Sequence, residues 1–148
     1  MIITDALLGE HAVFYAQFDY LEQSLPTADS LPLVKSQGAM LAAALAGHAQ
    51  LEEELLFTTL EPHIGPMGPL AVMRMEHEEI EQTLLEHLPA AQELDQARKL
   101  LLRVIEVARE HFAKEEQVVY RLAPQSLSAE ILTDLGTQWA AHRAIVLA

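Results

Sequence analysis

Four histidines recur along this sequence at positions where a helical hydrophobic pattern calls for an apolar residue. They are His11, His48, His77 and His111, and each has leucine, valine, phenylalanine or another apolar residue three or four positions away. Residues four apart on an α-helix differ by about 40° around the axis, so they share a face. Each histidine is therefore predicted to point into the interior of the protein.

A glutamate follows three of these histidines at the fourth position, which adds carboxylates to the same buried faces. These glutamates are Glu52, Glu81 and Glu115. Burying a carboxylate without a partner costs several kcal/mol, and no lysine or arginine lies on these stripes to neutralise them. Imidazole nitrogens and carboxylate oxygens that converge in a core suit a first-row transition metal.

This donor set is too large for one tetrahedral zinc ion and matches two metal ions bridged by carboxylates. Two divalent cations would balance three carboxylates and one bridging hydroxide, which leaves the core close to neutral. An oxo or hydroxo bridge between the ions is therefore expected. Iron is the expected metal because mixed nitrogen and oxygen donors suit its redox chemistry. Manganese and zinc remain alternatives.

The segments "HAQLEEELLF" (48–57) and "HFAKEEQVVY" (111–120) repeat one pattern: His-x-x-x-Glu-Glu-x, two aliphatic residues and an aromatic one. A looser copy is "HEEIEQTLLE" (77–86). The glutamates next to the inward carboxylates are predicted to be solvated, because a five-residue step rotates about 140° around the helix; they are Glu53, Glu54, Glu78 and Glu116. The remaining histidines are expected at the surface or in packing roles: His63, His87 and His142.

The elements that must position these side chains are five helices, predicted over about 4–25, 32–60, 69–88, 90–122 and 128–147, with Ser30 and Ser128 as N-caps. The Pro- and Gly-rich segment 61–69 is predicted to be a loop. The chain is thus expected to be one all-α domain over 1–148. We predict an antiparallel up-down four-helix bundle over about 4–122. The additional C-terminal helix covers the bundle or forms a homodimer, with Trp139 and Ile145 in the interface.

Composition narrows the functions further. The 148 residues carry a formal net charge of −13, which disfavours binding to nucleic acid or to anionic membranes. The absence of cysteine excludes disulfides, thiolate zinc sites and iron–sulfur ligation. No signal peptide and no run long enough to span a bilayer are visible, so a cytoplasmic location is expected.

These motifs give the chain a resemblance to the hemerythrin-like superfamily, and specifically to its His-His-Glu cation-binding domains. The resemblance runs from about His11 to Leu122 and includes the connection "IGPMGPLAVMRMEH" (64–77). It implies a four-helix bundle with a non-haem di-iron centre that binds or reacts with dioxygen, nitric oxide or peroxide. The ligands it implies are His11, His48, Glu52, His77 and His111, with Glu52 and Glu115 as bridging carboxylates and Glu116 as the rival to Glu115.

One departure from the family pattern lies in the third helix. Oxygen-carrying members have a second histidine there, whereas this sequence has Glu81, which would be a terminal ligand. A carboxylate makes the site harder and more anionic and stabilises ferric iron. We therefore expect a poor reversible oxygen carrier and a better oxidation, peroxide-handling, nitric-oxide-handling or iron-sensing centre. Tyr15, one turn after His11, would line the pocket, donate a hydrogen bond to a bound ligand or serve packing.

These expectations favour a protein that binds metal and a small molecule over a dedicated enzyme. The alternative is a metal-stabilised structural or protein-interaction module whose ion only neutralises the core. An open coordination position would distinguish the first from the second.

Overall fold

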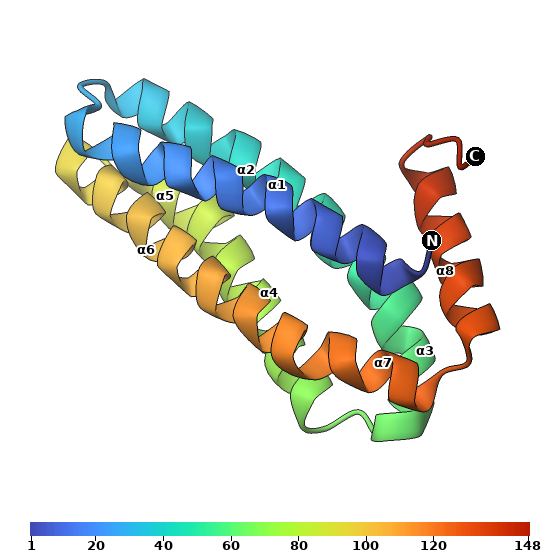
Figure 1. Ribbon diagram of the computed structural model, residues 1–148. Helices are drawn as coiled ribbons and strands as arrows, with labels where there is room; N and C mark the ends of the chain where they lie inside the picture. The colour runs from blue at the N-terminus through green and yellow to red at the C-terminus, as the bar shows by residue number, and fades with distance from the viewer.

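The computed structural model describes residues 1–148 and is a four-helix bundle with a further helix across one end (Figure 1). No strand is present, so the predicted all-α class is confirmed. The four long helices, which run alternately up and down, are α1 (Ile3–Ser24), α2 (Leu31–Leu51), α4 (Pro69–Gln82) and α6 (Leu94–Lys114). The helix across the end is α8 (Ala129–His142).

Three of the long helices continue through a π-helical turn into a short α-helix. The turn Glu52–Phe57 leads from α2 into α3 (Thr58–Ile64), and the turn Thr83–His87 leads from α4 into α5 (Leu88–Ala90). The turn Glu115–Val119 leads from α6 into α7 (Tyr120–Ser126). A short 3₁₀ turn, Leu25–Thr27, follows α1. Turns of the π type occur frequently at functional sites.

Two predicted N-caps are confirmed, while several helix boundaries were wrong. The Ser30 and Ser128 side chains accept backbone N–H groups at 3.4 and 3.2 Å. The predicted loop 61–69 is largely helical, since α3 continues to Ile64 with Pro62 inside it. Only 65–68 form the turn, where Gly65 and Gly68 adopt positive φ angles that other residues rarely take.

Proline also failed to end two other helices where we expected it to. The third bundle helix continues one residue past Pro89, and the fourth begins at Leu94 rather than at 90 and extends beyond 122 with Pro124 inside it. Each proline lies within two residues of the end of its helix, Pro89 before Ala90 and Pro124 before Ser126, so it disturbs only the last turn.

The apolar core forms two clusters, one on each side of the histidine layer. Towards α8 it contains Leu7, Phe57 and Trp139; towards the other end it contains Phe18 and Leu84. In α1, α2 and α4 the histidine lies between a residue of the first cluster and a residue of the second, and after His111 of α6 the first cluster is reached at Val119 in the π turn. The polar layer is therefore enclosed by apolar packing at both ends.

The C-terminal helix α8 packs against α1 close to the N-terminus (Figure 1). Trp139 is only 8% exposed and belongs to the core, so a homodimer through this helix would have to use other residues. Ile145 is 46% exposed, and the dimer itself stays a prediction. None of the helices is both long and apolar enough to cross a membrane.

Candidate metal centre

Six of the seven predicted ligands converge in the middle of the bundle. Their donor atoms form two groups, and within each group all atoms lie within 4.8 Å of one another. We call the first group, His11 and His48 with Glu115, the His11 half. We call the second group, which comprises Glu52, His77, His111 and again Glu115, the His77 half.

Glu115 belongs to both halves and directs one oxygen to each. Its Oε1 lies 2.7 Å from His111 Nε2 and 3.4 Å from His77 Nε2, while its Oε2 lies 3.2 Å from His11 Nε2. Glu52 also lies between the halves, because its Oε2 is 3.4 Å from His77 Nε2 and 4.0 Å from His48 Nε2. Of the two rivals in helix four, Glu115 faces the centre and Glu116 does not.

The inward-facing atoms fit a cation because the protein leaves most of them without a partner. Both carboxylate oxygens of Glu115, Glu52 Oε2, His77 Nε2 and His111 Nε2 are buried and make no hydrogen bond. Such groups are rare in folded proteins because each costs about 1–3 kcal/mol. Cations placed among them would supply the missing partners.

Each histidine is held from behind by a carboxylate at its other ring nitrogen, Nδ1. The four N–H donors and their acceptors are His11 to Glu116 (2.9 Å), His48 to Glu10 (2.6 Å), His77 to Glu53 (2.7 Å) and His111 to Glu76 (2.9 Å). Every acceptor belongs to a bundle helix next to that of its histidine. The four pairs therefore form a closed ring around the bundle, which we call the carboxylate ring.

The carboxylate ring selects the histidine tautomer that a metal needs. An Nδ1–H that donates to a carboxylate leaves the lone pair on Nε2, and the carboxylate also raises the basicity of the imidazole. In this tautomer the Nε2 lone pairs of His11 and His48 face each other at 3.2 Å. Two acceptors at this distance repel each other, and a cation between them would remove the repulsion.

The ring corrects two of our predictions. Glu53 and Glu116 were expected to be solvated, yet they hold His77 and His11. Glu10 and Glu76 were missed altogether. The sequence does contain a signal: each ring carboxylate is the immediate neighbour of an inward-facing residue, in "EH" at 10–11 and 76–77 and in "EE" at 52–53 and 115–116.

The electrostatics of the metal-free centre reflect this crowding. Burial lowers the pKa of His77, but the surrounding carboxylates Glu115, Glu52 and Glu53 outweigh it and raise the pKa to about 11. Burial raises the pKa of Glu10, yet hydrogen bonds from His48 and Arg143 bring it down to about 2. The carboxylates around His77 therefore favour a positive charge at this position, which a bound cation would supply.

The two halves follow one plan. Each combines the histidine of a Glu-His dipeptide (10–11 or 76–77) with a His-x-x-x-Glu-Glu motif (48–53 or 111–116), and the carboxylate-ring contacts of one half recur in the other. A π turn begins at the first glutamate of each motif, Glu52 or Glu115. It brings residues five apart onto the same side, since its hydrogen bonds run from residue i to i+5. Phe57 and Tyr120 are thereby placed beside the centre.

The aromatic residues after the two π turns differ in chemistry. Phe57 stacks on His77 with the rings parallel to within 2° and the centroids 5.9 Å apart. Tyr120 donates its hydroxyl to Glu52 Oε1 at 2.7 Å, and the hydroxyl oxygen of Tyr120 lies 3.1 Å from His11 Nε2. Sequence reasoning missed Tyr120, although the two repeated motifs visibly differ at this position.

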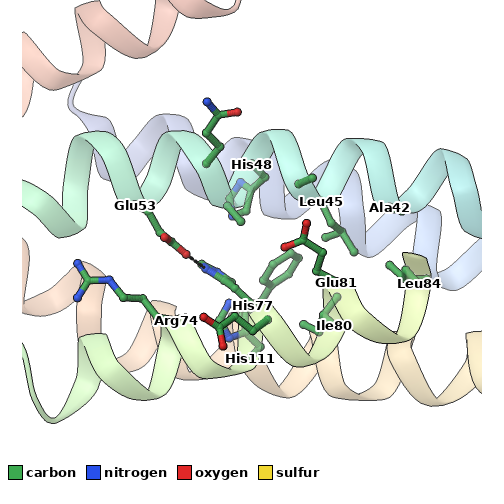
Figure 2. A pocket seen from close by; sticks show the side chains of 15 residues that line it. Ala42, Leu45, His48, Glu53, Arg74, His77, Ile80, Glu81, Leu84 and His111 are labelled. Carbon is green, nitrogen blue, oxygen red and sulfur yellow. Dashed lines mark hydrogen bonds and ion pairs between the residues drawn. The ribbon is translucent and has the colours of Figure 1, made fainter. Parts of the chain in front are cut away.

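An aromatic ring covers one histidine of the centre, His11, and a cavity borders the other three. Phe112, which follows His111, stacks on His11 with centroids 3.8 Å apart. Its counterpart after His48 is Ala49, which is too small to cover His77. A cavity of about 470 Å³ lies between α2 and α4. Ala49 and His77 line it, and it reaches His111 (Figure 2).

Glu81 lies outside the two donor groups. It is exposed and lines the cavity with its carboxylate, between α2 and α4 (Figure 2). Tyr15, its counterpart one turn after His11, donates to Glu116 and so supports the carboxylate ring. Arg109 covers the Tyr15 ring, whereas small alanines leave Glu81 open. The histidines that we expected outside the site are all exposed: His63, His87 and His142.

Comparisons with known proteins agree with this geometry. Residues 2–123 match the family model described as the hemerythrin HHE cation binding domain. The matched segment covers all four bundle helices and every residue of the two donor groups, and it ends before α8. The search of curated proteins and the search of solved structures each found no match.

Proposed function

Because the chain belongs to the hemerythrin HHE cation-binding family, we propose that its two donor groups hold two iron ions as a non-haem di-iron centre. The observation that carries this proposal is the convergence of buried, unpartnered nitrogen and oxygen atoms into two groups that share Glu115. Mixed imidazole and carboxylate donors suit iron. When bound, iron would supply redox chemistry and a position for a small ligand.

The residues of this chain would have distinct roles. His11 and His48 would hold one ion and His77 and His111 the other, each oriented by the carboxylate ring. Glu115 and Glu52 would bridge the ions and fix their separation. Tyr120 offers its hydroxyl as a hydrogen-bond donor beside Glu52, in the His11 half.

We propose that a small molecule reaches the centre through the cavity at the His77 half. Its size suits dioxygen, peroxide or nitric oxide, and it leads past Glu81 to His77 and His111. His11 does not line this cavity and is stacked on Phe112 instead. The acidic side chains at the mouth of the cavity favour cations and neutral molecules over anions.

The test is metal content together with ligand binding. The purified chain is loaded with ferrous iron under argon, dialysed, oxidised to the ferric state in air, and analysed by mass spectrometry and visible absorption before and after azide. We expect about two iron ions per chain and an absorption band that azide shifts. His48→Ala and His111→Ala should each lose metal, whereas His63→Ala, at an exposed histidine, should keep it.

The same experiment separates this function from the metal-stabilised structural module. A chain that retains iron but whose spectrum ignores azide and nitric oxide would have closed coordination positions, and the structural module would then be the better description. A folded chain that takes up no transition metal would contradict both.

A further inference from the structure

The C-terminal helix α8 reaches the metal centre through one carboxylate, Glu10. Glu10 Oε2 accepts the Nδ1–H of His48 at 2.6 Å. Its other oxygen, Oε1, accepts from Trp139 Nε1 at 3.0 Å and from Arg143 Nε at 2.7 Å. Trp139 lies in α8, and Arg143 directly follows His142, the last residue of that helix. One carboxylate thus joins a histidine of the centre to a helix outside the matched family segment.

The equivalent carboxylate in the other half is held differently. Glu76, which accepts from His111, receives its cation from Lys114 of α6 at 2.5 Å. In α2, the position that corresponds to Lys114, three residues after the histidine of the motif, is Leu51. Leu51 is buried and packs in the apolar cluster below α8.

This difference makes the halves unequal in what they need. The bundle provides the His77 half with both the carboxylate and the lysine that holds it. For the His11 half the bundle provides the carboxylate alone, and the cationic side chain that pairs with this carboxylate is that of Arg143. Without α8, Glu10 would keep its hydrogen bond from His48 but lose both partners on Oε1.

We propose that α8 is a positioning element for the metal site of the His11 half, so that docking of α8 and metal binding at this half reinforce each other. The inference rests on the proposed di-metal function. Trp139 and Arg143 fix Glu10, Glu10 fixes the tautomer and orientation of His48, and His48 presents Nε2 to the ion. Linkage is reciprocal: if docked α8 strengthens metal binding, bound metal strengthens the docking of α8 by the same factor.

The chain contains its own reporter for this coupling. Trp139 is the only tryptophan, and its indole N–H donates to the same carboxylate that holds His48. Its emission should therefore respond to occupation of the His11 half. Zinc is a suitable probe because it is redox-inactive and takes the same nitrogen and oxygen donors.

The test compares Arg143→Ala with Lys114→Ala, which removes the equivalent cation from the other half. Metal retention after dialysis against a chelator is measured together with Trp139 emission during zinc titration. Loss of an outer partner of a metal-binding histidine typically lowers affinity about 10–100-fold. We expect Arg143→Ala to lower the affinity for one of the two ions by this factor. The zinc concentration at the midpoint of the fluorescence titration should increase by the same factor. Lys114→Ala should lower the affinity for one ion and leave the midpoint of the fluorescence titration unchanged.

Two further variants guard against a trivial loss of structure. Arg143→Lys should restore much of the metal affinity, because it returns a cation to Glu10. Gly136→Ala should displace α8 without changing any partner of Glu10, since a Cβ there would overlap the carbonyl oxygen of Met1. It should therefore reproduce the effect of Arg143→Ala. Circular dichroism establishes that the bundle is folded in each case.

The outcomes are distinguishable. If the wild-type chain binds two ions and Arg143→Ala and Gly136→Ala bind both with unchanged affinity, the role of α8 is refuted and the di-metal function stands. If Arg143→Ala lowers the affinity for both ions equally, the substitution acts on the whole centre, and the inference is again refuted. A wild-type chain that takes up no metal would refute the proposed function, and the inference with it.

Discussion

Tyr120 and Phe57 each lie five residues after the glutamate that begins a π turn, yet only Tyr120 donates a hydrogen bond to the centre. Its hydroxyl lies 2.7 Å from Glu52 Oε1 and is buried. Phe57 instead stacks on His77 and has no polar atom to offer. Two copies of one motif have therefore acquired different chemistry through a single oxygen atom.

Replacing Tyr120 by phenylalanine should destabilise the metal-free protein. The change leaves one buried oxygen of Glu52 without its donor, which costs about 1–3 kcal/mol. Urea denaturation of the metal-free chain measures the effect, and Tyr20→Phe is the control because Tyr20 is 64% exposed. If Tyr120→Phe and Tyr20→Phe unfold at the same urea concentration, the hydroxyl does not stabilise Glu52.

Substitutions of the sequence neighbours Glu53 and Glu54 should differ in their effect on metal affinity. Glu53 accepts the Nδ1–H of His77 at 2.7 Å, whereas Glu54 pairs only with Gln50 at the surface. Glu53→Ala should therefore lower metal affinity about 10–100-fold. Glu54→Ala should leave it unchanged. Competition titration against a chromophoric chelator measures both, and equal affinities in the two variants would remove Glu53 from the site.

A large side chain beside His77 should close the cavity. Ala49→Phe places beside His77 the side chain that Phe112 presents to His11, and should slow azide or nitric oxide binding by about tenfold or more. Iron content should stay the same, because no donor atom changes. Ala43→Phe, at an exposed position outside the cavity, is the control. Stopped-flow traces that coincide for the variant and the control would show that ligands use another path.

The metal-induced gain in thermal stability should increase with pH. In the metal-free protein the pKa of His77 is raised from 6.5 to about 11, so its contribution to stability is full below about pH 6.5 and is lost as pH rises through 11. The pKa of His48 is raised as well. Metal binding requires neutral imidazole, and releasing the proton that His77 holds costs about 1.4 kcal/mol less for each unit by which pH rises towards 11.

Thermal unfolding of zinc-loaded and metal-free protein tests this dependence. The difference between the two Tm values should widen by about 3 °C or more between about pH 6 and pH 9. The double variant His48→Ala/His111→Ala, which lacks a donor in each half, should show no such trend. A difference that narrows with pH in the wild-type chain would contradict the sign of the His77 shift.

The bundle and its inward donors could be predicted because they depend on helical periodicity alone. His48 and Glu52 are four apart, as are His111 and Glu115, and this spacing determines their common face before any packing is known. Glu81 has the same spacing and still lies outside the donor groups. Its position depends on the small residues of α2 across the cavity, which its own helix does not reveal.

The carboxylate ring and Tyr120 could not be predicted from periodicity. Glu53 and Glu116 point to neighbouring helices, so their role depends on how adjacent helices pack. Tyr120 reaches the centre because a π turn replaces one α turn, and the five-residue step after Glu115 then no longer rotates away from the core. Helix-to-helix register and local changes in helical winding are tertiary properties.

The carboxylate ring also has a consequence for how the chain folds. Each histidine receives its carboxylate from another helix, so no pair of helices contains a complete half-site with all its supports. A partly folded intermediate would lack the preorganised ligands and would bind metal weakly. Tight metal binding should therefore follow the last docking step of the bundle, which would make a mononuclear kinetic trap short-lived and metal capture a late event in folding.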